Sequence, residues 1–124
     1  MGKVSSVENP NERRKYVRAT LIGSALVSPK GGGKAFTAVL DNVNRIGAGL
    51  HAKENPPVKN KVTVSLAFLD PDQAEQQEKL SGTVAWVKPW EKGYLIGVVW
   101  DELVTKEKNR WLYYYLEETL RSTV

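Results

Sequence analysis

Cysteine is absent from this chain of 124 residues, and histidine occurs once, as His51. Without cysteine the chain cannot form a disulfide bond, a thiolate metal site or a cysteine nucleophile. A metal site built from several histidines is excluded as well. No residue pattern supplies His51 with a nucleophile or an orienting acid, so the sequence predicts a protein that is not an enzyme and holds no metal or cofactor.

Long hydrophobic runs are also missing. No stretch approaches the roughly 20 apolar residues that a membrane-spanning helix needs, and residues 1–11 contain no apolar segment of the secretory type. We therefore expect a cytoplasmic protein without a membrane span. Residues 1–12 are polar and lack periodicity, which predicts a flexible N-terminal arm, and residues 13–124 are long enough for a single domain with one core.

The chain has a formal net charge of +4, and its positive charge is concentrated in the first half. Residues 1–53 carry nine basic and three acidic side chains, a net +6, whereas residues 54–124 carry nine basic and eleven acidic ones, a net −2. The densest segment, residues 13–18, holds four cations in six positions. Such a segment suits an anionic partner, although charge runs also occur as solvated segments that keep a protein soluble.

Short apolar or alternating segments separated by turns predict an all-β fold, an antiparallel sandwich or barrel. The polar segment 70–79 is interpreted as a loop or a short helical turn, and residues 88–93 as the turn of a hairpin. The glycines that precede Lys34 are interpreted as a turn, because they lack the spacing of a phosphate loop. The predicted strands cover residues 19–28, 35–43, 48–52, 62–68, 80–86 and 94–100.

The C-terminal segment changes period and predicts an amphipathic helix over about residues 105–121, packed across an open end or seam of the barrel. Thr105 is the predicted N-cap, and Asn109 is placed on the solvent side. Tyr113 and Tyr114 fall nearer the exposed face and offer a surface for a dimer, so a monomer and a homodimer both stay open. The apolar positions are Trp111, Leu112, Tyr115, Leu116 and Leu120.

Two short motifs carry candidate binding chemistry. Arg14 and Arg18 form an RxxxR spacing, and two guanidinium groups four residues apart can surround one ligand and donate to its phosphate oxygens. In the second motif, residues 42–47, the side chains of Asn42 and Asn44 can donate and accept hydrogen bonds, and Gly47 permits a close approach by the ligand.

With both motifs in this order, the chain resembles the PilZ family of bacterial cyclic di-GMP receptors from residue 12 to residue 120. Arg14 and Arg18 match the family's RxxxR, and Asn42 and Gly47 bracket its [D/N]xSxxG motif, with Asn44 in place of the family's serine. Residues 82–86 and 94–98 match the family's paired strands. The resemblance implies a six-stranded antiparallel β-barrel with a C-terminal α-helix.

The resemblance also implies a ligand and a set of roles. Arg14 and Arg18 would grip the phosphates and guanines of cyclic di-GMP, Asn42 and Asn44 would hold a guanine edge, and Gly47 would shape the turn. Arg13, directly before the motif, implies that two stacked molecules bind. Ordering of the arm would then signal to an unidentified downstream protein in motility, exopolysaccharide or biofilm control.

Two alternatives stay open, and both concern the partner. A PilZ-like domain with a degenerate nucleotide site could act purely as a protein-interaction module. A small basic β-barrel with aromatic residues could instead bind single-stranded nucleic acid by stacking. Trp86, Trp100 and Trp111 are, however, assigned to the core or seam and Trp90 to a turn, and the cations concentrate in residues 13–18. The sequence therefore predicts no interleaved basic and aromatic surface, and no DNA partner is expected.

Overall fold

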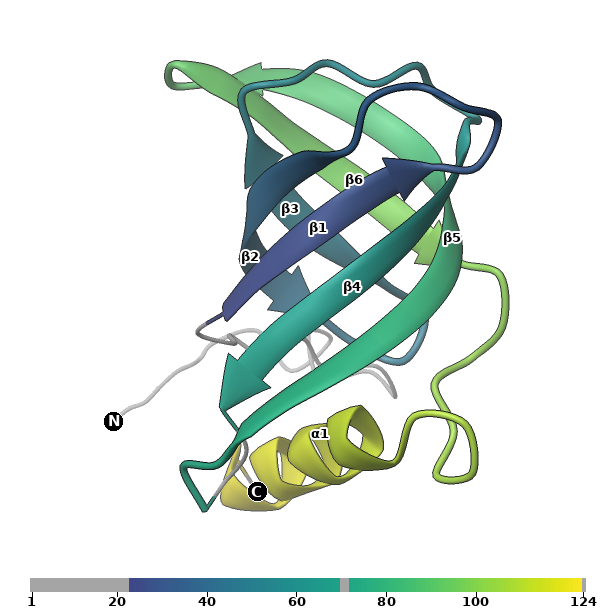
Figure 1. Ribbon diagram of the computed structural model, residues 1–124. Coiled ribbons are helices and arrows are strands. Elements are labelled where there is room, and N and C mark those ends of the chain that lie inside the picture. The colour runs from purple at the N-terminus through teal and green to yellow at the C-terminus, as the bar shows by residue number, and fades with distance from the viewer. Residues whose placement is uncertain (1–22, 70–71, 124) are drawn as a thin grey trace.

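The computed structural model describes residues 23–69 and 72–123, with side chains described to residue 117. Six antiparallel strands form a closed barrel in the order β1-β2-β3-β6-β5-β4, and one helix lies across an end of it (Figure 1). The predicted fold, a six-stranded antiparallel β-barrel with a C-terminal helix, is confirmed. The elements are β1 (Gly23–Pro29), β2 (Phe36–Val43), β3 (Gly47–Ala52), β4 (Lys61–Leu69), β5 (Glu75–Trp90), β6 (Gly93–Trp100) and α1 (Arg110–Thr123).

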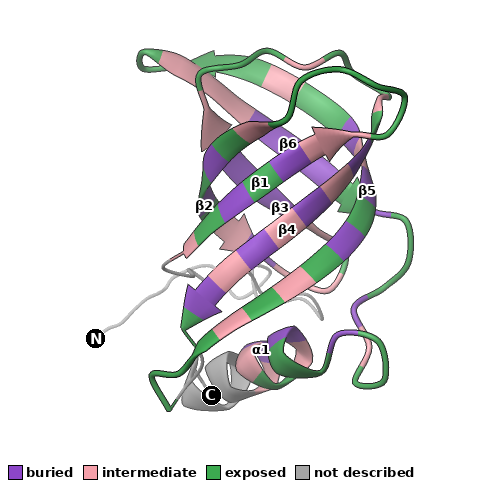
Figure 2. Cartoon of the chain, in the orientation of Figure 1, coloured by how far each residue is buried: buried purple, intermediate pink, exposed green. Residues whose placement is uncertain are grey.

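The core fills the barrel because alternate side chains of each strand point inward. Buried and exposed bands consequently alternate along the strands (Figure 2). On β4 the inward side chains are Val62, Val64, Leu66 and Phe68, all nearly inaccessible to solvent. Leu112 and Leu116 of α1 join this core, and the ring of Tyr115 meets that of Phe68 edge-on at 6.0 Å. The helix therefore closes one end of the barrel.

Part of the segment predicted as a loop is strand. β5 begins at Glu75, which pairs with Leu69, so residues 75–79 extend the β4–β5 ladder. Glutamate and glutamine have low strand propensity, but this side of the sheet is open to water and the ladder satisfies the backbone groups. The β5–β6 turn is also shorter than predicted, because β5 continues to Trp90 and only residues 91 and 92 separate the two strands.

A β-bulge in β5 overturns the predicted burial of one tryptophan. Before the bulge, Leu80 and Val84 point into the core, and the register shifts between Val84 and Trp86. One additional residue moves the following even-numbered side chains to the outer face. Trp86 is therefore 41% exposed rather than buried. Trp111 is also exposed, contrary to the prediction, whereas Trp100 is buried as expected.

The helix begins five residues later than predicted, at Arg110. Thr105 Oγ1 accepts a hydrogen bond from the backbone N–H of Lys108, but this contact closes a turn before the helix. The first helical N–H groups, those of Trp111 and Leu112, both donate to Glu78 Oε2 of β5, at 2.9 and 3.2 Å. A carboxylate at this position also suits the positive end of the helix dipole. Asn109, predicted to face solvent, is buried.

The barrel core predicts that replacing a buried leucine lowers the free energy of unfolding much more than replacing an exposed one. Leu50 of β3 is fully buried, so Leu50→Ala should leave a cavity and lower the free energy of unfolding by about 2–5 kcal/mol. Leu26 of β1 is 43% exposed, and Leu26→Ala should cost far less. Urea denaturation followed by circular dichroism measures both, and equal losses would contradict the assigned core.

Candidate functional site

A row of four residues crosses the barrel wall from β2 to β5. Asn42 pairs with Gly49, Gly49 pairs with Gly97, and Gly97 pairs with Trp86. The two middle positions carry no side chain, so the centre of the row is bare backbone. Register shifts precede both ends, between Leu40 and Asn42 on β2 and beside Trp86 on β5. Bulges of this kind redirect side chains, and here they direct two of them onto one surface.

Asn42 and Trp86 lie over the two glycines. A Cβ atom at Gly49 would stand 2.9 Å from Asn42 Nδ2, and one at Gly97 would collide with the indole ring of Trp86. The Asn42 amide thus lies against the backbone of Gly49 at one end of the row, and the Trp86 indole lies against the backbone of Gly97 at the other end. A surface pocket of about 210 Å³ opens here, lined by Asn42, Asn44 and Trp86 among others. The indole, 41% exposed, presents a flat surface to any occupant of this pocket.

The loop between β2 and β3 is held by the side chain of Asn44. Its Oδ1 accepts hydrogen bonds from the backbone N–H groups of Ile46, at 2.8 Å, and Gly47, at 3.0 Å. The backbone N–H of Asn44 in turn donates to the carbonyl of Gly47 at 2.9 Å. A Cβ at Gly47 would collide with the carbonyl oxygen of Val98, so only glycine fits at this position. Asn44 therefore builds the turn itself.

The rear of this loop is tied to the segment that leads into α1. The backbones of Arg45 and Val104 approach closely, since Val104 N–H donates to the Arg45 carbonyl and Arg45 Nε donates to the Val104 carbonyl, each at 3.0 Å. The Arg45 guanidinium also lies 5.5 Å from the ring centre of Tyr113. Trp100 Nε1 donates to the carbonyl of Asn44 at 3.2 Å. These contacts with Val104, Tyr113 and Trp100 fix the conformation of the loop.

Of the predicted site residues, Asn42, Asn44 and Gly47 line one pocket. Arg13, Arg14 and Arg18 lie outside the described residues. The sequence did not reveal Trp86, Gly49 or Gly97 as site residues, because the two bulges that bring them together leave no clear mark in the hydrophobic pattern. Arg45 was missed because its partner Val104 is 59 positions away in sequence.

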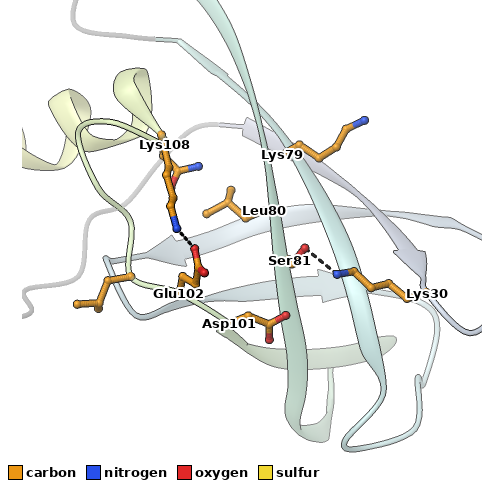
Figure 3. Close-up of a pocket in the computed structure, with 9 residues that line it drawn as sticks. Lys30, Lys79, Leu80, Ser81, Asp101, Glu102 and Lys108 are labelled. Atoms are coloured by element: carbon orange, nitrogen blue, oxygen red, sulfur yellow. Dashed lines mark hydrogen bonds and ion pairs between the residues drawn. The ribbon is translucent and has the colours of Figure 1, made fainter.

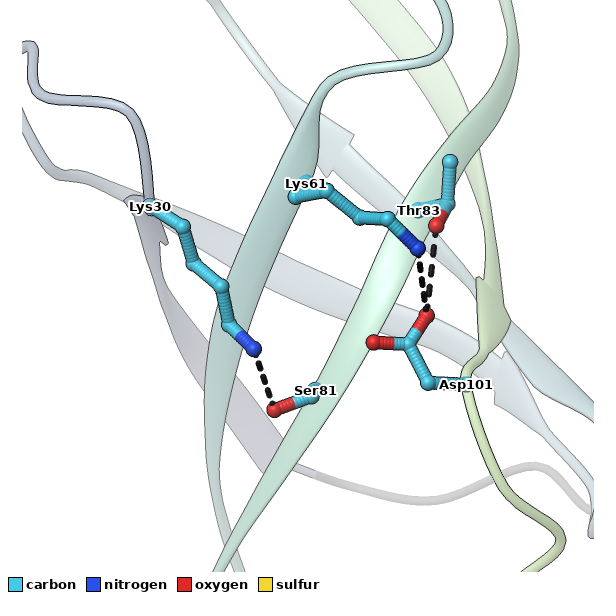
Figure 4. Close-up of polar contacts among 5 residues, drawn as sticks. All are labelled: Lys30, Lys61, Ser81, Thr83 and Asp101. Carbon is cyan, nitrogen blue, oxygen red and sulfur yellow. Dashed lines mark hydrogen bonds and ion pairs between the residues drawn. The ribbon is translucent and has the colours of Figure 1, made fainter.

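A second pocket, of about 390 Å³, lies on another part of the barrel and is lined by Lys30, Lys79 and Lys108 (Figure 3). Its charges are largely compensated. Lys108 contacts Glu102, and Lys30 Nζ donates to Ser81 Oγ at 2.7 Å. Close by, Asp101 Oδ1 accepts from two side chains, Lys61 Nζ at 3.3 Å and Thr83 Oγ1 at 3.2 Å (Figure 4). This pocket includes no motif residue.

Residues 23–69 and 72–123 contain no group of three or more His, Asp or Glu side chains arranged to hold a metal ion. The same part of the chain has no helix that is long and apolar enough to cross a membrane. The row of Asn42, Gly49, Gly97 and Trp86, with the loop beside it, is the candidate functional site because the residues of the second motif line its pocket.

Comparison with known proteins places the chain in a family. A search of curated protein sequences finds no match. Among solved structures, the inhibitor of motility MotI/DgrA of Bacillus subtilis is similar, with a TM-score of 0.60 and 15% identity over 88% of this chain and 52% of that chain. This chain thus spans about half of that protein's length, and the likeness concerns the fold. The PilZ domain model matches residues 12–117. The chain therefore belongs to the PilZ domain family, whose members are binding and regulatory modules and generally cyclic di-GMP receptors.

Proposed function

We propose that this chain is a cytoplasmic cyclic di-GMP receptor that holds the nucleotide over the glycine row. One observation carries the proposal, namely that Asn42, Asn44 and Gly47 of the second motif share a pocket with the exposed indole of Trp86. A guanine base needs a flat surface for its face and polar groups for its edge. The bare backbone at the centre of the row leaves room for the base to approach the indole with its face and the amide groups with its edge.

The roles of the groups follow from their contacts. Trp86 stacks on a guanine, an interaction worth about 1–3 kcal/mol per base. Asn44 Oδ1 is engaged in the turn, so its Nδ2 hydrogens are the part left to donate to guanine O6 or N7. Asn42 Nδ2 donates to Asp41 Oδ2 at 2.7 Å, which leaves the amide oxygen of Asn42 to accept from the guanine edge. Arg14 and Arg18 neutralise the phosphates.

Signalling follows from ordering of the arm, residues 1–12, over the bound ligand. Such ordering typically costs about 2–5 kcal/mol of the interaction energy and creates a new surface for a downstream partner. The contacts of Arg45 with Val104 and Tyr113 supply a second route, from the nucleotide loop to the start of α1. Control of motility, exopolysaccharide production or biofilm formation is the output that the family implies.

Isothermal titration calorimetry with cyclic di-GMP tests the receptor. Arg14→Ala and Arg18→Ala should each nearly abolish binding, because each removes a guanidinium that meets phosphate and base. Lys15→Ala, which removes a charge from the same segment but no motif residue, should bind almost normally. If the native chain gives no heat at high ligand concentration, the receptor proposal is wrong and a pure protein-interaction module remains.

Stoichiometry tests the binding of two stacked ligands. Each cyclic di-GMP carries two phosphate charges, so a stacked pair needs a third guanidinium to offset the repulsion between its members. Arg13→Ala should therefore reduce the calorimetric ratio from two ligands per chain to one while retaining the first. A ratio that does not change would eliminate the stacked pair.

The glycine row supplies a test that leaves every charged residue in place. In Gly97→Ala the new methyl group meets the indole of Trp86, so the ring must leave its position over the backbone. Loss of one stacked base should weaken cyclic di-GMP binding by about 10-fold to 100-fold, with a shift in tryptophan emission. Gly31→Ala, where a methyl group meets nothing within 4 Å, is the control. Unchanged affinity despite a displaced indole would remove Trp86 from the site.

A further inference from the structure

The bulge in β5 places aromatic and basic side chains alternately on the outer face of the barrel. After it, Trp86, Lys88 and Trp90 point outward, and the two indoles are 41% and 43% exposed. Lys88 Nζ lies between them, 5.8 Å from the ring centre of Trp86 and 5.9 Å from that of Trp90. We call Trp86, Lys88, Trp90 and the adjoining His51 the aromatic strip. His51 of β3 meets Trp90 edge-on at 5.8 Å.

A groove of about 590 Å³ continues the strip toward the β5–β6 turn. Trp90, His51 and Tyr94 supply its aromatic lining, and two further lysines and two glutamates also line it. With Lys88, the charged groups here are three lysines and two carboxylates, which leaves a small positive excess. The charged groove residues are Lys53, Glu54, Glu91 and Lys92.

We infer that the aromatic strip binds single-stranded nucleic acid, an activity beyond the receptor function proposed above. Proteins of this class combine aromatic side chains that stack on successive bases with cations that follow the backbone. The backbone positions of Trp86 and Trp90 are four strand residues, about 13 Å, apart. Lys88 Nζ lies 5.8 and 5.9 Å from their ring centres, so the two rings are separate surfaces that flank one cation, and each can stack on its own base. Lys88, placed between the rings, is positioned for the phosphate that joins them. Only unpaired bases expose the faces that such stacking needs.

The charge pattern favours nucleic acid over an acidic peptide. The two ion pairs among the described residues, Lys61 with Asp101 and Lys108 with Glu102, involve no lysine of the strip or groove. Lys88 contacts ring faces instead, so its charge is available to an anionic ligand. Two exposed ring faces on either side of a cation are the combination by which single-stranded nucleic acid is bound, each ring meeting a base and the cation a phosphate. The strip therefore contradicts the expectation that no basic and aromatic surface exists.

Fluorescence anisotropy of the full chain with labelled 12-nucleotide oligo-dT and oligo-U measures this binding. Three lysines on phosphates of a single strand predict a slope of about −2 for log K against log salt. Trp90→Ala should weaken binding by about 10-fold to 100-fold, and Trp90→Phe should restore most of it. Lys88→Ala should weaken binding and make the salt slope shallower by about 0.7.

Matched controls lie outside the strip. Trp111→Ala removes an equally exposed tryptophan from α1, and Lys79→Ala removes an exposed lysine from the other part of β5, so both should bind oligonucleotide as the native chain does. Circular dichroism and thermal melting verify the fold of each variant. Trp90→Ala should still bind cyclic di-GMP in calorimetry, because Trp90 lies outside the nucleotide pocket. Calorimetry with cyclic di-GMP therefore tests the receptor proposal independently of oligonucleotide binding.

Four results would overturn the inference. The first is the absence of oligonucleotide binding at low salt. The second is a loss of binding that is as large for Trp111→Ala or Lys79→Ala as for Trp90→Ala. The third is unchanged binding by Trp90→Ala together with loss on replacement of Arg13, Arg14 and Lys15, which would assign the activity to the N-terminal cations. A glutamate-rich peptide that binds the strip as tightly as oligo-dT would identify a protein-docking surface instead.

Discussion

The direct pairing of Gly49 with Gly97 is the constraint on which the candidate site depends. Any side chain at either position would occupy the space now filled by Asn42 or Trp86. The two glycines lie in the middle of a continuous barrel wall, and the residues that cover them come from β2 and β5, strands that do not pair with each other. The pocket is therefore a property of the closed barrel, because four strands must be in register before its two sides face each other.

The β2–β3 loop connects the pocket directly to the segment that leads into α1. The β2–β3 loop presents Asn44 to the pocket, and the following residue, Arg45, holds Val104 behind it. Glu78 of β5 accepts two hydrogen bonds from the first turn of α1, and the Arg45 guanidinium lies against the ring of Tyr113 in the same turn. This contact of Arg45 with Tyr113 extends the connection from the loop to the first turn of α1. Under the proposed function, this one short connection would link the ligand pocket to α1.

The sequence was sufficient for the fold and for part of the site. Period-two alternation is unmistakable in residues 62–68, where inward and outward side chains differ in polarity, and the turn chemistry of Asn44 and Gly47 is local. The β-bulges could not be read in the same way, since a single additional residue reverses every later side chain of a strand. Trp86 was consequently assigned to the wrong face. Residues 75–79 were missed because their strand structure comes from pairing with β4 rather than from their own propensity.

Trp86 lines the pocket beside the β2–β3 loop and also belongs to the aromatic strip, so the two proposed ligands would be coupled thermodynamically. If one indole face can serve only one base at a time, each ligand lowers the affinity of the other by the same factor, as linkage requires. Rising messenger concentration would then release a bound strand, and an abundant strand would raise the messenger concentration needed for half-saturation. A single shared side chain would make this barrel a reciprocal switch with no change in its fold.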